Sequence, residues 1–276
     1  MANKSYLFIS GNKPANIQNA DIFDADAVIF DIEDAVAPDE KDAARHLIRH
    51  YLSDLYPKDI DVYVRINGID SVWFDSDMAS LDKTAINGVV LPKATEASIV
   101  ACEQKLKTIQ KDWGVIALIE SPRGLTEVTT IAAHPVVEAL MFGAEDYSLA
   151  MNITRHESDL ALNHARNMVA LSAKAYGKEA IDTPYPDMRN QSRFEEETKA
   201  ARRMGFTGKA CIHPSHVAFI NKTFLPSEDE IIWAKKILAA EKKHQNEGVF
   251  ALDGAMIDEP IIAHAKGIIT EVNQDE

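Results

Sequence analysis

Eight short runs of β-branched and other apolar residues recur between Ser5 and His213, and most of them are continuous instead of alternating with polar residues. A continuous apolar run is typical of a strand that is buried on both faces of a parallel sheet. The sequence therefore predicts eight parallel strands, of which the seventh has the weakest pattern. The predicted strands are Ser5–Ser10, Ala27–Asp31, Val62–Asn67, Gly88–Lys93, Val115–Glu120, Ala139–Gly143, Ala180–Thr183 and Gly208–His213.

Amphipathic segments with helical periodicity lie between the predicted strands. Lys41–Leu55 and Asp159–Tyr176 are the clearest, because apolar residues recur along one stripe of each segment. These residues are Ala44, Leu47, Ile48, Tyr51, Leu52 and Leu55 in the first, and Leu160, Leu162, Val169, Leu171 and Ala175 in the second. A strand–helix unit repeated eight times predicts a (β/α)8 TIM barrel of the α/β class over residues 1–225.

An open, doubly wound sheet is the alternative architecture. Such a sheet usually has a glycine-rich phosphate-binding loop after its first strand. Here the first predicted strand is followed by Gly11-Asn12-Lys13-Pro14, which does not have that pattern. The closed barrel is therefore favoured.

Residues 226–276 lie outside the eightfold pattern and predict a C-terminal helical arm. Ser227 and Glu230 have the spacing of a capping box, which indicates the start of a helix. A turn is expected at Asp253-Gly254, and Pro260 suits the first turn of a last helix. We expect this arm either to cap its own barrel or to pack on a neighbouring subunit and complete a site there.

Charge and composition exclude some classes of partner. The net charge of −14 argues against nucleic acid, because phosphate backbones would repel the chain. Cys102 and Cys211 are far apart and are expected to be reduced, buried thiols. No apolar run is long enough for a secretory signal or a membrane span, so we expect a cytoplasmic protein with no membrane partner.

Ionisable residues stand at or near the end of nearly every predicted strand. In parallel barrels the chemistry takes place at the carboxyl ends of the strands, so these side chains are candidates for one site. They are Asp31, Glu33 and Asp34 after the second strand, Arg65 and Asn67 in the third, Lys93 in the fourth, Glu120 in the fifth, Glu145 and Asp146 after the sixth, Asp182 in the seventh and His213 in the eighth.

So many carboxylates at one barrel mouth would repel one another and would need a compensating cation. Mg²⁺ prefers a small number of carboxylates and keeps positions for water and substrate, whereas the sequence has no zinc-binding motif. Glu120 and Asp146, at the ends of neighbouring strands, are the best candidate ligand pair. Adjacent strand residues face opposite sides, so we expect one of Glu145 and Asp146 to be a structural partner.

Two basic residues have more than one interpretation. Arg65 lies in an otherwise apolar strand, so it either forms a buried salt bridge to Asp31 or Glu33 or acts as a fork for a substrate carboxylate or oxyanion. Lys93 stands at a strand end, where a lysine could form a Schiff base with a carbonyl substrate. That chemistry competes with the metal hypothesis.

Several segments resemble the citrate lyase beta-subunit family, within the wider HpcH/HpaI aldolase group. The resemblance covers nearly the whole chain, and its EDAV, RIN and GAEDY blocks are specific in combination. The similar segments are Phe8–Pro14, Asp26–Pro38 with Lys41, Val64–Asn67, Val89–Lys93, Leu118–Pro122, Phe142–Tyr147, Gly205–Pro214 and Gly254–Pro260.

The resemblance implies a homotrimeric barrel with Mg²⁺ on Glu120 and Asp146, and with Arg65 in contact with the substrate. It implies an acyl thioester substrate carried on coenzyme A or an acyl carrier protein, whose phosphates would meet Lys13. It also implies that Asp258 reaches an active site from the C-terminal arm, in its own subunit or in a neighbour. Two segments depart from the family pattern, namely Ser10 and Met188-Arg189-Asn190, and both lie where the thioester arm would run.

The predicted reaction is carbon–carbon cleavage of a 3-hydroxy acyl thioester of the citryl, citramalyl or malyl type to an acetyl thioester and a 2-oxo acid. Glu120 and Asp146 would hold Mg²⁺ and bring the substrate to it, Arg65 would stabilise the developing oxyanion, and Asp258 would transfer the proton, with Glu33 in reserve. Three alternatives are a 2-oxo acid aldolase without a thioester, a condensation like that of malate synthase, and a subunit of a larger lyase that needs an acyl carrier partner.

Overall fold

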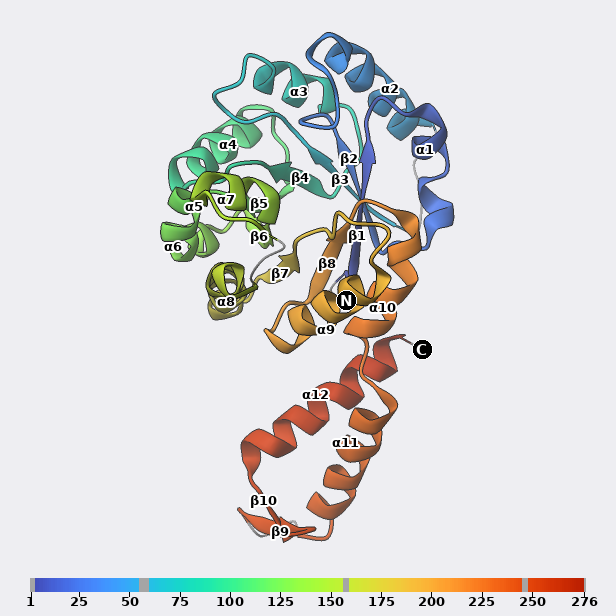
Figure 1. Ribbon diagram of the computed structural model, residues 1–276, viewed down its shortest axis with the longest axis vertical. Helices are drawn as coiled ribbons and strands as arrows, with labels where there is room; N and C mark the ends of the chain where they lie inside the picture. Colours follow the sequence, from blue (N-terminus) through green and yellow to red (C-terminus); the bar gives the residue numbers. More distant parts are fainter. Residues whose placement is uncertain (1–2, 55–59, 156–158, 245–247, 276) are drawn as a thin grey trace. The chain divides into compact units, whose positions relative to one another are not determined.

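The computed structural model describes residues 3–54, 60–155, 159–244 and 248–275. Eight parallel strands pair in sequence order, and β1 pairs with β8, which closes the barrel (Figure 1). This confirms the predicted (β/α)8 fold. The strands are β1 (Ser5–Ser10), β2 (Ala27–Asp31), β3 (Asp61–Arg65), β4 (Gly88–Leu91), β5 (Gly114–Ile119), β6 (Val137–Phe142), β7 (Glu179–Asp182) and β8 (Gly208–Cys211).

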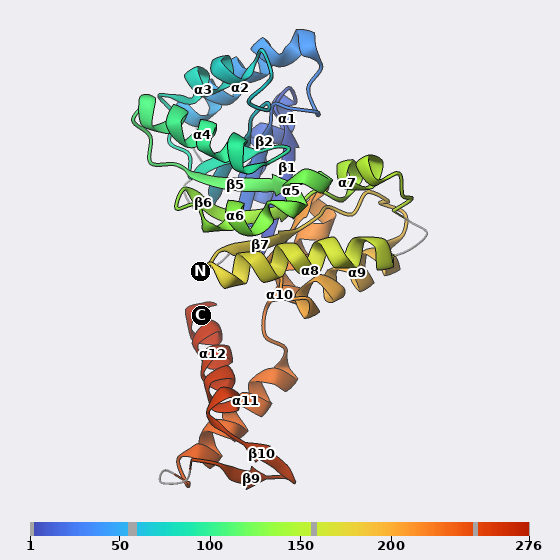
Figure 2. The ribbon, with the colours of Figure 1, turned by 90° about the vertical axis from the view of Figure 1, so that its left-hand side faces the viewer.

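Helices follow the strands and cover the outside of the barrel (Figure 2). They are α1 (Pro14–Gln18), α2 (Lys41–Asp54), α3 (Phe74–Leu81), α4 (Glu96–Thr108), α5 (Pro122–Thr126), α6 (Val128–Ala133), α7 (Ala144–Met151), α8 (Asp159–Ala175), α9 (Gln191–Arg203) and α10 (Val217–Phe224). Short 3-10 turns at Ala20–Phe23, Pro38–Glu40 and Pro214–His216 complete the connections.

The predicted helices are confirmed in place, but part of the second apolar stripe is wrong. Leu162 and Val169 of α8 are buried, whereas Leu160 and Leu171 are exposed. The reason is geometric, since α8 buries only the side that faces the barrel. Leu55, at the predicted end of the first helical segment, lies outside the described residues.

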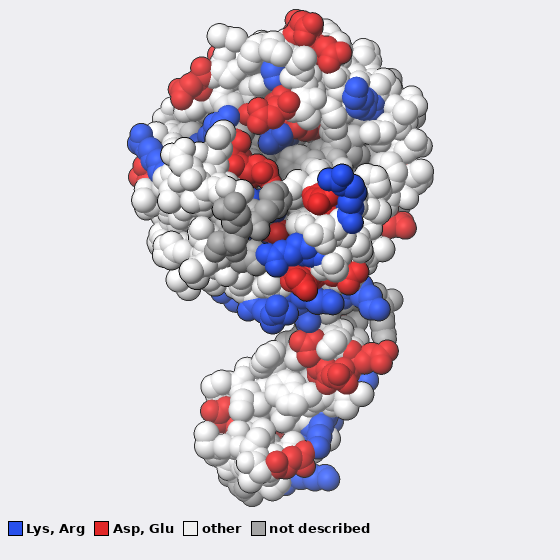
Figure 3. All heavy atoms as spheres, in the orientation of Figure 1, with Lys and Arg blue, Asp and Glu red and all other residues white. Residues whose placement is uncertain are grey.

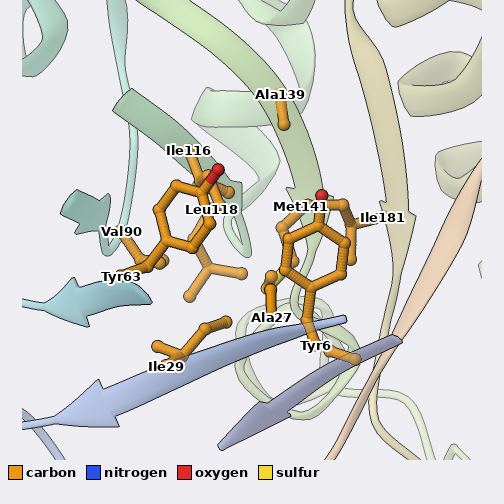
Figure 4. Packing of buried hydrophobic residues seen from close by; sticks show 11 residues of the cluster. Tyr6, Ala27, Ile29, Tyr63, Val90, Ile116, Leu118, Ala139, Met141 and Ile181 are labelled. Atoms are coloured by element: carbon orange, nitrogen blue, oxygen red, sulfur yellow. The ribbon is translucent and has the colours of Figure 1, made fainter. Parts of the chain in front are cut away.

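The barrel interior is filled by side chains from alternate positions on the strands, as Figure 4 shows. Tyr6 and Tyr63 lie in this layer with ring centroids 6.1 Å apart. The pairing of β5 with β6 shifts register between Val115 and Ile116, so that Glu138 is an extra residue on β6. A Cβ on Gly114 would lie 1.8 Å from the Glu138 carboxylate, so a larger residue here would require the Glu138 side chain to move.

The chain divides into two compact units, one ending at Asn221 and the other beginning at Lys222. The C-terminal unit contains α11 (Glu228–Glu241), the hairpin strands β9 (Phe250–Leu252) and β10 (Ala255–Ile257), and α12 (Glu259–Asp275). Ser227 and Glu230 form the predicted capping box of α11. The hairpin turns at Asp253 and Gly254, which both have positive φ. Ile262, Ala265 and Ile268 of α12 are buried in the apolar core of this unit.

Among the described residues, no helix combines the length and the apolar character that a membrane span requires.

Candidate active site at the carboxyl ends of the strands

The carboxyl ends of the barrel strands enclose a cavity of about 390 Å³. Its lining combines five carboxylates, two arginines and an apolar part. The carboxylates are Asp31, Asp34, Glu120, Glu145 and Asp146, the arginines are Arg65 and Arg155, and the apolar part includes Phe8, Leu118, Met141, Phe142 and Ile212. Figure 3 shows a hollow in the barrel unit with acidic and basic side chains gathered around it.

Glu120 follows β5 directly and is 6% exposed. Its Oε1 accepts a hydrogen bond of 2.8 Å from the backbone N–H of Lys93. Burial and the neighbouring charge of Asp146 raise the pKa of Glu120 to about 8, although the Lys93 N–H and Arg65 oppose this rise. A nearby cation would lower the pKa of this carboxyl group, because a cation stabilises the ionised form.

Asp146 lies in the first turn of α7, next to Glu145. The expectation that strand alternation would separate these two side chains is wrong, because the chain becomes helical at Ala144 and both residues line the cavity. Glu145 forms an ion pair with Arg155. The start of α7 is also tied to β7, since the Ala144 N–H donates to Oγ1 of Thr183 at 3.1 Å.

Arg65 forms the salt bridge that was one of its two interpretations, and it also lines the cavity. Its Nε and Nη2 donate to the two oxygens of Asp31 at 2.9 and 2.5 Å, and its Nη1 lies 3.3 Å from Oε2 of Glu33. Asp31 is 2% exposed, so the pair is largely desolvated. Asp31 therefore holds the guanidinium in one orientation at the cavity wall.

A second set of buried polar residues fixes the loop that contains Glu33. The Nζ of Lys41 donates to the carbonyls of Ile32 and Glu33 at 3.0 and 2.9 Å. The Nδ2 of Asn67 donates to the Ile32 carbonyl and to Asp77, which is fully buried and also bonds Arg45. The sequence offered a signal for these roles, because Lys41 and Asn67 belong to the motifs on which the resemblance rests.

Glu33 is a buried carboxyl group that lines a cavity next to the one described above. It is 7% exposed, and burial raises the pKa of its carboxyl although Arg65 opposes the rise. Its Oε2 accepts a 2.9 Å hydrogen bond from the Asp34 N–H. The Nζ of Lys93 lies 3.5 Å from its Oε1. Burial alone would lower the pKa of Lys93, but Glu33 and the other nearby carboxylates raise it, which disfavours the neutral amine that a Schiff base requires.

A network of buried charges links α7 to the layer between the barrel and its outer helices, and sequence reasoning missed most of it. Lys209 is fully buried, and its Nζ donates to Asp182 at 2.6 Å and to Glu197 at 2.9 Å. Arg166 forms two 2.9 Å bonds to Asp182. Arg155 lies 3.2 Å from Glu197 and donates to the Pro184 carbonyl at 2.7 Å. Asp182, predicted among the mouth residues, is thus part of this network.

The last two predicted residues, Lys13 and Asp258, belong to different units of the chain. Lys13 precedes α1 with an exposed side chain and is not among the described residues that line the cavity. Asp258 belongs to the C-terminal unit, where its Oδ1 accepts a hydrogen bond of 3.3 Å from the Ile261 N–H at the start of α12. Their predicted roles rest on the resemblance.

The residues at the mouth fit a hard divalent cation. The donors are carboxylate oxygens, and their charges exceed those of the arginines beside them. Within the described ranges, no cluster of three or more His, Cys, Asp or Glu side chains is arranged to hold a metal ion. A cation here would take two protein carboxylates, Glu120 and Asp146, with the remaining positions left to water or substrate, which is the pattern that Mg²⁺ prefers.

Comparison with known proteins identifies the family. Residues 4–214 match the family model described as HpcH/HpaI aldolase/citrate lyase. The chain belongs to the HpcH/HpaI aldolase/citrate lyase family. It is 32% identical over 281 residues to citrate lyase subunit beta of Leuconostoc mesenteroides subsp. cremoris, with 98% of this chain and 93% of that protein covered. It is 28% identical over 287 residues to the mitochondrial citramalyl-CoA lyase of Rattus norvegicus, with 97% and 85% covered.

The HpcH/HpaI fold is also found among solved structures. Protein CitE from Mycobacterium tuberculosis, in complex with magnesium, acetoacetate and coenzyme A, matches with a TM-score of 0.85 at 30% identity, and the match covers 99% of this chain and 98% of that one. The resemblance to the citrate lyase beta subunit and the prediction of a lyase are confirmed.

Proposed function

We propose that this chain is a Mg²⁺-dependent carbon–carbon lyase that cleaves a 3-hydroxy acyl thioester to an acetyl thioester and a 2-oxo acid. The observation that supports it best is the position of Glu120 and Asp146, which follow neighbouring strands and line one cavity with the clamped Arg65. The relatives named for citrate lyase and citramalyl-CoA lyase, and the neighbour solved with magnesium and coenzyme A, support the same reaction class.

In the proposed reaction the 3-hydroxyl loses its proton and the bond between C2 and C3 breaks. The electron pair goes to C2, which then takes up a proton to give the acetyl thioester, while C3 becomes the carbonyl of the 2-oxo acid. Bound Mg²⁺ would supply Lewis-acid charge for this cleavage. Arg65, held by Asp31, would stabilise negative charge on the substrate oxygen without having to reorient.

Proton transfer is assigned to Asp258, with Glu33 in reserve. Glu33 lies beside Arg65 and lines a neighbouring cavity, and burial raises the pKa of its carboxyl, which favours a form that can carry a proton. Asp258 is assigned because the arm segment Gly254–Pro260 is similar to the corresponding loop of the family. Kinetics of Asp258→Asn and Glu33→Gln variants separate the two roles. The variant that lacks the proton-transfer group should have a much lower kcat, whereas its KM should change less.

A panel of coenzyme A thioesters tests the proposed function directly. Citryl, citramalyl and malyl thioesters are each incubated with the purified chain, with and without Mg²⁺, and formation of the 2-oxo acid is measured. We expect cleavage of at least one thioester only when Mg²⁺ is present. Cleavage that persists in EDTA, or normal turnover by a Glu120→Ala variant, would contradict the metal assignment.

The same panel separates the alternative reactions. Cleavage of free 2-oxo-3-deoxy acids without coenzyme A would indicate an aldolase that needs no thioester. Faster condensation of acetyl-CoA with glyoxylate than cleavage would indicate the direction of malate synthase. Borohydride trapping of substrate on Lys93 would replace the metal mechanism with a Schiff base. Activity only after addition of an acyl carrier partner would indicate a subunit of a larger complex.

We further propose a cytoplasmic homotrimer in which Asp258 acts on the site of a neighbouring subunit and Lys13 binds the phosphates of the thioester carrier. Mixing inactive Glu120→Ala and Asp258→Ala subunits tests the first part. For random exchange in a symmetric trimer with sites shared between subunits, about a quarter of the sites would be intact. Recovered activity supports action in trans, and none after verified subunit exchange supports action in cis. Lys13→Ala should raise KM for the thioester and leave kcat unchanged.

A further inference from the structure

The end of strand β4 departs from a pattern that four other strands share. After β1, β2, β3 and β6, the first N–H beyond the paired residues bonds a carbonyl of the neighbouring strand, as Gly143 does with Ile119 at 3.0 Å. Leu91 of β4 pairs with Ala117 of β5, so the same register would direct the Lys93 N–H to the Leu118 carbonyl. Instead the Ala94 N–H makes that bond, at 3.0 Å.

The chain has therefore inserted one residue before it returns to the ladder, as in a β-bulge. That residue is Lys93, and its φ is +50°, in the left-handed region that costs energy for any residue with a Cβ. The result is a backbone N–H that is released from the sheet. It donates to Oε1 of Glu120 at 2.8 Å.

The opposite side of the Glu120 side chain is closed by Gly143. A Cβ placed there would lie 2.6 Å from the Cβ of Glu120 and 2.8 Å from its Oε2. The carboxyl group is thus confined between the Lys93 N–H, which occupies Oε1, and the backbone of Gly143, which lies beside Oε2. Glu120 is also buried, so its side chain has little freedom to leave this orientation.

We propose that Lys93 is a positioning residue whose left-handed backbone fixes Oε1 of Glu120 and leaves Oε2 to bind the metal. The inference rests on the proposed Mg²⁺ site. It assigns the role to the Lys93 main chain and not to its ammonium group. A strained conformation retained at a functional site is expected where the strain sets the geometry of a ligand.

Two substitutions at this position separate the backbone from the side chain. Lys93→Gly and Lys93→Val both remove the ammonium group, but glycine adopts positive φ freely and a β-branched residue resists it. We expect Lys93→Val to bind Mg²⁺ about tenfold or more weakly than Lys93→Gly, because the left-handed conformation becomes costlier. Mg²⁺ affinity is measured by calorimetry on the full chain without substrate.

Turnover measurements provide a second test with the same two variants. Lys93→Val should need more Mg²⁺ for half-maximal activity than Lys93→Gly, and saturating Mg²⁺ should restore most of the kcat of Lys93→Val relative to Lys93→Gly. If Lys93→Val does not fold, Lys93→Asn and Lys93→Ala provide the comparison, since asparagine tolerates positive φ better than alanine. Equal Mg²⁺ affinities in the glycine and valine variants, or in the asparagine and alanine variants, would overturn the inference.

The outcome can be distinguished from failure of the proposed function. Mg²⁺ binding that follows the backbone preference in a chain with no lyase activity would support the positioning role and contradict the reaction. Lyase activity with equal affinities would support the reaction and contradict the positioning role. A wild-type chain that binds no Mg²⁺ would contradict both.

Discussion

Gly143 and Glu120 approach each other so closely that a Cβ on Gly143 would lie 2.6 Å from the Cβ of Glu120. Gly143 has a negative φ of −105°, so glycine is required here for space and not for backbone conformation. The glycine of the GAEDY block thus determines where the preceding strand's carboxylate can lie.

Gly143→Ala should weaken Mg²⁺ binding and activity, because the added methyl group has to displace the Glu120 carboxyl. We expect about a tenfold or larger loss in Mg²⁺ affinity, which corresponds to more than about 1.4 kcal/mol. Calorimetry with Mg²⁺ measures it. Gly267→Ala is the matched control, since nothing lies within 4 Å of the added Cβ there. Unchanged affinity in Gly143→Ala would mean that Glu120 is not held by this contact.

Mg²⁺ binding should release a proton from Glu120 below pH 8. Burial raises the pKa of this carboxyl to about 8, so at pH 7 the metal-free group is mostly protonated and the metal has to displace its proton. Affinity should therefore increase about tenfold per pH unit up to about pH 8 and level off above it. Calorimetry in buffers of different ionisation enthalpy counts the protons. Glu120→Gln, which has no carboxyl to titrate, should lose both the proton release and most of the affinity.

Arg65→Lys should reduce kcat/KM by about tenfold to a hundredfold, because an ammonium group cannot keep two parallel bonds to Asp31 and also point to the cavity. Arg65→Ala should in addition lower the free energy of unfolding by about 3–5 kcal/mol, since Asp31 is left buried without its partner. Steady-state kinetics and urea unfolding measure the two effects. Arg123→Lys is the control, because Arg123 forms an exposed pair with Glu127 and should change neither quantity appreciably.

Lys209→Met should destabilise the barrel by about 3–5 kcal/mol, because Asp182 and Glu197 lose a buried cation. Burial alone would raise the pKa of Asp182, but Arg166 and Lys209 outweigh it and lower the pKa to about 2. Ionised Asp182 therefore contributes about 2 kcal/mol to the free energy of unfolding above pH 4. That contribution is lost as the pH falls from 3.8 towards 2.

Urea unfolding between pH 7 and pH 2 checks both parts of this prediction. The wild-type chain should lose stability mainly below pH 4, whereas Lys209→Met should begin to lose it at higher pH, because the pKa of Asp182 rises. Lys199→Met on α9 is the control, since its side chain is more than half exposed. Equal acid sensitivity of Lys209→Met and the wild type would show that Lys209 does not stabilise ionised Asp182.

The barrel could be predicted from the sequence because most strands are buried on both faces and therefore appear as nearly continuous apolar runs. Even Ala180–Thr183, the weakest run, corresponds to β7. Strand ends were less predictable. Lys93 was placed inside its strand, whereas the chain leaves the sheet there at positive φ, and a lysine gives no sequence signal for that conformation.

Some residues of the candidate site could be predicted from the sequence, but the contacts between them could not. Strand order brings Glu120, Asp146 and Arg65 to one mouth, which follows from topology alone. The salt bridge between Asp31 and Arg65 depends on strand register, because the two residues are paired directly across β2 and β3. The Arg155 network joins residues about 10 to 40 positions apart through side-chain contacts that only a packed structure determines.

The exposure of Lys93, which lines a cavity together with Glu33, offers a way to detect ligands bound there. The side chain of Lys93 is 60% exposed, whereas Lys41 and Lys209 are buried. An amine-directed label should therefore modify Lys93 and spare the other two as internal references within the same digest. Protection of that one peptide by substrate analogues, followed by mass spectrometry, would report ligand occupancy at equilibrium without any turnover.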